Sequence, residues 1–151
     1  MYYYRNGQMK DFDDYKQKVE VLVSKDTSFY EFLIEGSKIN EKVDDVIKYS
    51  RELLKLNPGD LETRMILGEY LFKMNQYQEA EKVFLEIRDR LSTYPKSSYY
   101  LSKIYIKQNE LDKALKIAEG EMASNPSRAD GHYIMGEVLK LKEDYLPSTR
   151  S

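Results

Sequence analysis

The sequence predicts an all-α fold, a solenoid built from antiparallel helical hairpins. Two observations predict it. Apolar residues recur at helical spacing along most of the chain, and polar turns interrupt this spacing at regular intervals. Small and large apolar positions also repeat at a shift of 34 residues. A fixed period of this length indicates units that bury their apolar faces only against their neighbours.

The 34-residue period is clearest at small residues. A helical glycine lets a second helix come close, because it has no side chain to hold that helix away. Ala80 offers the same close approach from the partner helix. The recurring positions are Leu67, Leu101 and Met135; Gly68, Ser102 and Gly136; Ala80 and Ala114; and, with one substitution, Pro58, Ser92 and Pro126. The sequence therefore predicts helical hairpins that pack at small residues.

The period also sets the expected domain organisation. We expect one helical-repeat domain at 1–146 and a C-terminal tail at 147–151. Its repeats are expected at about 1–26 (partial), 27–60, 61–94, 95–128 and 129–146 (partial). Both terminal repeats are therefore expected to be incomplete.

The first three helices are expected at 8–24, 28–39 and 42–56. An apolar stripe predicts the first of them, with Phe12, Tyr15, Val19 and Leu22 at helical spacing. Ser28 and Glu31 have the spacing of a capping box, which predicts where the second begins. The segment 57–60, with sequence Asn-Pro-Gly-Asp, ends the third.

Helices are then expected at 61–73 and 77–91, which form the central hairpin. Their apolar stripes are Leu61, Met65, Leu67, Leu71 and Phe72, then Tyr77, Ala80, Val83, Phe84 and Ile87. A further pair is expected at 95–107 and 111–123, with Pro95 at the first helical position. The last helix is expected at 128–142.

These positions resemble the repeat of the tetratricopeptide-repeat (TPR) proteins. That unit carries large-x-x-Leu-Gly-x-x-Tyr, then Gly-x-Tyr-x-x-Ala, then an aromatic residue and a closing proline. The matches are Leu67, Gly68, Tyr77, Ala80 and Phe84; Leu101, Tyr105, Ala114 and Pro126; and Met135, Gly136 and Tyr145. The first large position departs from the pattern, because Arg64, Ser98 and His132 stand there. The resemblance implies a right-handed superhelix whose first helices line a concave groove.

The resemblance also implies which side chains would contact a ligand in that groove. Carried over position by position, they are Glu35, Met65, Glu69, Phe72, Tyr99, Lys103, Ile106, Lys107, Tyr133 and Glu137. Apolar anchors among charges of both signs suit a peptide or helix with hydrophobic side chains. The alternative for each aromatic residue is packing between repeats.

Composition disfavours several other classes of protein. The net charge of -2 and a pI near 5.6 argue against a nucleic-acid partner, which would require clustered Lys and Arg. Cysteine is absent, so disulfides and thiolate metal sites are excluded. No apolar run has the length of a membrane span or a signal peptide, so we expect no membrane insertion and a cytoplasmic location.

The sequence offers no constellation for catalysis. The single histidine, His132, has no partner at helical spacing. The adjacent acids at 13–14 and 44–45 diverge by about 100° on a helix, so neither pair converges. No glycine-rich loop between a strand and a helix could hold a phosphate. We expect no enzyme, no cofactor and no metal.

The sequence therefore predicts a protein–protein interaction scaffold or adaptor that holds a peptide or helical segment of a partner. Two alternatives stay open. One is a structural oligomer that self-associates through its incomplete end repeats. The other is the regulatory fragment of a larger multidomain protein.

Overall fold

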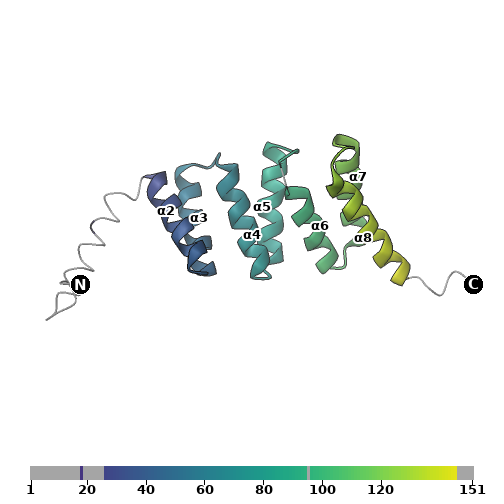
Figure 1. Cartoon of the computed structure of the whole chain (residues 1–151), viewed down its shortest axis with the longest axis horizontal. Helices are drawn as coiled ribbons and strands as arrows, with labels where there is room; N and C mark the ends of the chain where they lie inside the picture. Colours follow the sequence, from purple (N-terminus) through teal and green to yellow (C-terminus); the bar gives the residue numbers. More distant parts are fainter. Residues whose placement is uncertain (1–17, 19–25, 95, 146–151) are drawn as a thin grey trace, which may run out of the picture. The chain divides into compact units, whose positions relative to one another are not determined.

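The computed structural model describes residues 18, 26–94 and 96–145, which contain seven helices and no strand (Figure 1). They are α2 (Thr27–Ile39), α3 (Val43–Leu56), α4 (Leu61–Lys73), α5 (Tyr77–Arg90), α6 (Ser97–Lys107), α7 (Leu111–Ser124) and α8 (Ala129–Tyr145). The all-α fold is confirmed. The predicted helix at 8–24, apart from Lys18, and the tail at 147–151 lie outside the described residues.

The chain divides into two compact units, 1–60 and 61–151. In the first unit, α2 and α3 form a hairpin whose core includes Ile34, Val46 and Leu53. The second unit holds the hairpins α4–α5 and α6–α7, followed by α8. The boundary between the units coincides with the predicted boundary between repeats 27–60 and 61–94. The expectation of one domain over 1–146 stays a prediction.

The observed ends of α2 to α5 and of α7 lie within one residue of the predicted ones, but two other helices differ. Pro95, the predicted first residue of a helix, lies outside the described residues, and α6 begins at Ser97 because Lys96 has a left-handed backbone (φ 68°). The last helix continues to Tyr145 instead of ending at 142. Near this end, Lys142 donates to Asp112 Oδ1 of α7 at 2.6 Å.

The predicted capping box at Ser28 and Glu31 is also wrong. The N-cap of α2 is Asp26, whose Oδ1 accepts a hydrogen bond from the Ser28 backbone nitrogen at 2.9 Å. A carboxylate at this place satisfies an amide that has no partner within the helix. Ser28 therefore lies inside the first turn instead of preceding it.

The turns inside the three hairpins share one geometry at a spacing of 34 residues. Each places a non-glycine residue in the left-handed region: Glu41 (φ 55°), Asn75 (φ 60°) and Asn109 (φ 59°). Each also carries the same two backbone hydrogen bonds. They are Lys42 N to Ser37 O and Glu41 N to Lys38 O; Gln76 N to Leu71 O and Asn75 N to Phe72 O; and Glu110 N to Tyr105 O and Asn109 N to Ile106 O. This is the Schellman motif, which satisfies the last carbonyls of a helix.

The predicted packing at Gly68 is confirmed. A Cβ atom on Gly68 would lie 2.7 Å from Phe84 Cζ, so the aromatic ring of α5 rests on the glycine of α4. The Phe84 ring is fully buried and stacks on Tyr100 of α6, with centroids 5.2 Å apart and planes 2° apart. Phe84 therefore closes one hairpin and joins it to the next.

The first helices of the second unit lie side by side. Helix α6 contacts both α4 and α8, in addition to the second helices α5 and α7. This arrangement brings equivalent positions of α4, α6 and α8 close together.

Candidate functional site

Four of the predicted groove residues meet where α6 and α8 lie side by side. Lys103 Nζ of α6 donates to both carboxylate oxygens of Glu137 on α8, at 2.8 and 2.9 Å. The same nitrogen lies 5.6 Å from the ring centroids of Tyr99 and Tyr133. The two ring centroids are 6.4 Å apart. We refer to Tyr99, Lys103, Tyr133 and Glu137 as the tyrosine–lysine cluster.

The 34-residue period explains why this cluster forms. Tyr99 and Tyr133 share one repeat position, and Lys103 and Glu137 share the position four residues later. Residues four apart lie on the same face of a helix. Since α6 and α8 are adjacent, each tyrosine faces the other and the lysine faces an acid of opposite charge.

The charges within the cluster compensate each other. Burial lowers the pKa of Lys103, but the hydrogen bond and the negative charge of Glu137 outweigh that effect, so its pKa is raised. Lys103 therefore stays protonated to a more alkaline pH than a free lysine does. The Tyr133 side chain is 57% exposed. The cluster thus presents an aromatic surface beside a neutralised ion pair.

The remaining predicted groove residues of the second unit are mostly engaged in packing. Met65 is buried. The Phe72 ring contacts the rings of Tyr77 and Tyr100, with both centroid distances at 5.4 Å. Ile106 is half-buried. For Phe72, the structure therefore favours the packing alternative stated for the aromatic residues.

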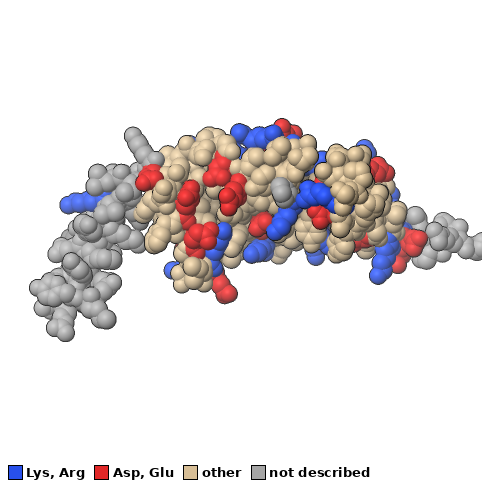
Figure 2. All heavy atoms as spheres, turned by 45° about the horizontal axis from the view of Figure 1, so that its top comes forward, with Lys and Arg blue, Asp and Glu red and all other residues tan. Residues whose placement is uncertain are grey.

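The charged residues of the predicted groove are more accessible. Lys107 is exposed and Glu69 is half-buried. Burial, together with the charge of Glu69, raises the pKa of Tyr100. In the first unit, the exposed Glu35 pairs with Lys38 at 2.8 Å. Figure 2 shows Lys and Arg interspersed with Asp and Glu over the second unit, so neither sign dominates the face drawn there.

The structure also contains a buried acid that the sequence reasoning missed. Glu121 of α7 is only 6% exposed, and Ser98 Oγ of α6 donates to its Oε2 at 2.7 Å. Arg128 lies 3.6 Å from its other oxygen, and Arg88 of α5 donates to Ser98 Oγ. We refer to Arg88, Ser98, Glu121 and Arg128 as the glutamate network. It joins α5, α6, α7 and the turn before α8.

A signal for this network is present in the sequence. Glu121 shifts by 34 residues onto Ile87 and by 68 onto Leu53, and both of these side chains are fully buried. A charge at a core position of the repeat requires hydrogen-bonding partners. Ser98, at the position where the TPR pattern has a large residue, provides one of them.

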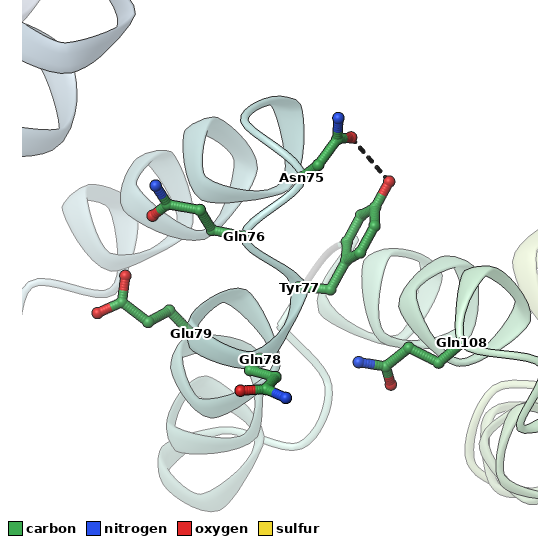
Figure 3. Close-up of a pocket in the computed structure, with 6 residues that line it drawn as sticks. All are labelled: Asn75, Gln76, Tyr77, Gln78, Glu79 and Gln108. Carbon is green, nitrogen blue, oxygen red and sulfur yellow. Dashed lines mark hydrogen bonds between the residues drawn. The ribbon is translucent and has the colours of Figure 1, made fainter.

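A separate hollow of about 460 Å³ lies beside the turn between α4 and α5 (Figure 3). It is lined by Asn75, Gln76, Tyr77, Gln78, Glu79 and Gln108. The Tyr77 hydroxyl donates to Asn75 Oδ1 at 2.8 Å, and Figure 3 shows Gln78 and Gln108 across the hollow from each other. None of the predicted groove residues lines it. Four of its six lining residues carry carboxamide side chains, which are absent from the tyrosine–lysine cluster.

The described residues contain neither a metal-binding cluster nor a membrane-spanning helix. No group of three or more His, Asp or Glu side chains in residues 26–94 and 96–145 is arranged to hold a metal ion. None of the seven helices combines the length and the apolar character needed to cross a bilayer.

Comparison with known sequences shows similarity to a human protein. The human protein IFIT1 homolog B is 28% identical over 98 residues, which cover 62% of this chain and 21% of that protein. The chain therefore corresponds to about a fifth of the human protein. No protein-family model matches the chain.

Comparison with solved structures shows the fold. The solved chain of MamA from Desulfovibrio magneticus RS-1, which runs from residue 41 to the end of that protein, aligns with a TM-score of 0.69 at 20% identity, covering 78% of this chain and 67% of the solved one. YrrB, described as a TPR protein with an unusual peptide-binding site, aligns with a TM-score of 0.70 at 18% identity. The alignment covers 84% of this chain and 66% of the YrrB chain. The Arabidopsis OM64 TPR domain aligns with a TM-score of 0.67 at 9% identity. The alignment covers 78% of this chain and 97% of that domain. The resemblance stated from the sequence is thus confirmed at the level of the fold.

Proposed function

We propose, with the TPR fold as the premise, that this chain is a protein–protein interaction scaffold. It would hold a peptide or helical segment of a partner against the first helices of the second unit. The tyrosine–lysine cluster supports this proposal most strongly, because it combines exposed aromatic surface with an ordered ion pair on adjacent first helices. The description of YrrB as a peptide-binding TPR protein is consistent with it.

The proposed mechanism is apolar burial on a preformed surface. Tyrosine buries a large area at a small cost in conformational entropy, and the partner would cover the exposed Tyr133 ring. The Lys103–Glu137 pair is already neutralised, so it would orient a partner more than attract one by charge. A segment with a hydrophobic side chain flanked by polar residues fits this surface best.

The test is a selection from a phage-displayed peptide library with the wild-type chain as bait. Selected peptides are then measured against Tyr133→Ala and against Leu85→Ala. Leu85 is a suitable control because it is also exposed, at 39%, but lies on the second helix α5. We expect Tyr133→Ala to weaken binding at least tenfold and Leu85→Ala to leave it unchanged, with equal helicity by circular dichroism.

Equal binding by both variants would contradict the assignment to the tyrosine–lysine cluster. The other expectations from the sequence stay predictions: no enzymatic activity, no nucleic-acid partner and a cytoplasmic location. Self-association and a role within a larger protein stay alternatives. A mass that rises with concentration in light scattering would favour self-association.

A further inference from the structure

The hollow beside the α4–α5 turn lies between two consecutive hairpins of the second unit. Asn75 and Gln76 belong to that turn, and Tyr77 and Gln78 begin α5. Gln108 follows α6 as its C-cap (Figure 3). Both hairpins, α4–α5 and α6–α7, lie within the described residues, and a solenoid repeat contacts only its neighbours. A further repeat at either end of the chain would therefore leave this hollow open.

Gln108 has an unsatisfied hydrogen-bond acceptor at the hollow. Its Oε1 atom is buried and accepts no hydrogen bond from any described residue. Figure 3 shows its amide nitrogen directed toward Gln78 on the opposite wall. A carboxamide keeps nearly the same shape after half a turn, because its terminal torsion has two similar minima. A ligand group with both a donor and an acceptor therefore satisfies Gln108 in either orientation.

The lining favours a ligand without charge. None of the six lining residues is basic, and Glu79 is acidic, so a phosphate or a carboxylate would be repelled. The four carboxamides offer N–H donors as well as acceptors, and a cation has no acceptor for those donors. The N-cap Gln76 makes no side-chain hydrogen bond to the first turn of α5, whose positive end also disfavours a cation. A neutral group with both donor and acceptor fits best.

Two neutral ligand classes have such groups, and Tyr77 separates them. A saccharide packs its C–H face on an open aromatic face. Tyr77 is half-buried, its ring contacts that of Phe72 with centroids 5.4 Å apart, and its hydroxyl donates to Asn75. A peptide group needs no such face. Because it is trans, its C=O and N–H point to opposite sides, which matches Gln78 and Gln108 across the hollow.

We propose that this hollow binds the main chain of an extended peptide from a partner protein. One peptide group lies between Gln78 and Gln108, accepting a hydrogen bond from one carboxamide and donating to the other. The site is separate from the tyrosine–lysine cluster and does not depend on the function proposed for that cluster. Main-chain hydrogen bonds do not read side chains, so the hollow would add affinity for peptides of many sequences.

The probe is acetyl-tetraglycine dimethylamide, which has peptide groups and no side chains. Its matched control, acetyl-tetrasarcosine dimethylamide, keeps the carbonyls but has a methyl group in place of each N–H. Binding to the full chain is followed by ¹H–¹⁵N NMR at the carboxamide resonances of Gln78 and Gln108. The variant Gln108→Met removes the acceptor at similar size. Methionine fits this turn, since Met74 has the equivalent position one repeat earlier.

We expect saturable shifts with the tetraglycine peptide, equal in the wild type and in Tyr133→Ala. Binding should be at least tenfold weaker in Gln108→Met, read at Gln78, and for the tetrasarcosine peptide. Equal binding of the two peptides, equal binding by Gln108→Met, or no shift up to the solubility limit of tetraglycine would overturn the proposal. Saturable shifts with maltose and none with tetraglycine would assign the hollow to a saccharide and would also overturn it.

Urea unfolding of the chain alone separates a partner from the chain itself as the source of the peptide group. Because no described residue donates to Gln108 Oε1, Gln108→Met should unfold at the same urea concentration as the wild type or at a higher one. A lower midpoint would show that another segment of the chain already satisfies this oxygen, which would overturn the assignment to a partner.

Discussion

Substitution Gly68→Ala tests the contact on which the central hairpin depends. The added methyl carbon would lie 2.7 Å from Phe84 Cζ and 2.8 Å from its Cε1, whereas ordinary carbon contacts begin near 3.4 Å. The Phe84 ring cannot retreat easily, because it is fully buried and stacked on Tyr100. Overpacking of this kind costs about 1–3 kcal/mol, and the better helix propensity of alanine returns about 1 kcal/mol. Because the buried and stacked ring cannot move away, we take the upper part of the overpacking range, about 2–3 kcal/mol, and expect a net loss of about 1–2 kcal/mol.

The chain contains its own control for this prediction. Gly136 has the same repeat position on α8, but a Cβ atom there meets nothing within 4 Å. Gly136→Ala should therefore gain only the propensity term and stabilise the chain by about 0.5–1 kcal/mol. The two substitutions are chemically identical. Their effects on stability have opposite signs because an aromatic ring lies against Gly68 and none lies against Gly136.

The assay is urea unfolding followed by circular dichroism at 222 nm, a standard helical wavelength, with wild type and both variants in parallel. Phe84→Leu in the Gly68→Ala background provides a rescue, because the smaller side chain makes room for the methyl group. Phe84→Leu should therefore destabilise the Gly68→Ala variant less than it destabilises the wild type. A double-mutant cycle measures this coupling. Gly68→Ala stability equal to or above that of the wild type would refute the reasoning.

Three further predictions follow from other parts of the structure. Glu121→Ala should destabilise by about 2–3 kcal/mol in chemical unfolding, because Ser98 and Arg128 lose a buried acceptor, whereas Glu121→Gln, which keeps an acceptor for Ser98, should lose less. An equal loss in the two variants would contradict this. Glu41→Gly should raise the melting temperature, because glycine adopts the left-handed backbone of this turn without strain, a gain of about 0.5–1 kcal/mol. A melting temperature below that of the wild type would show that the turn tolerates glutamate without strain. Burial and a hydrogen bond to Glu81 raise the pKa of Tyr105 from 10.0 to about 12. The protonated hydroxyl therefore contributes fully to folding stability below pH 10, and this contribution is lost as the pH rises toward 12. Tyr105→Phe should flatten the stability profile over that alkaline range, and an unchanged slope would contradict the assignment.

The turns explain why most of the fold could be predicted from the sequence. Polar turns bound each apolar stripe, so both ends of α4, Leu61 and Lys73, are predicted to the residue. Two helix starts could not be, because they depend on local hydrogen bonding and backbone geometry. Asp26 competes with Ser28 as a cap, and Lys96 adopts a left-handed backbone that no pattern of apolar residues reveals.

The candidate site was predictable where the period alone determines it. Tyr99 and Tyr133 face each other because equivalent positions of adjacent first helices meet. The period does not say how far a side chain is buried, which is why Phe72 and Met65 could not be separated from accessible residues. Glu121 was missed because its charge suggests an exposed position, whereas the side chain is buried. A charged residue indicates a surface position unless its register is compared with that of Ile87 in the preceding repeat.

The glutamate network restricts how the number of repeats in this chain could change by duplication or loss. Removing 61–94 would keep every turn in phase, yet it would put Leu54 in the register of Arg88 and break the network. Removing 95–128 would take out the serine, the glutamate and the second arginine together. Repeats with equivalent backbones are therefore not interchangeable modules, and their order is encoded in hydrogen bonds that only one arrangement completes.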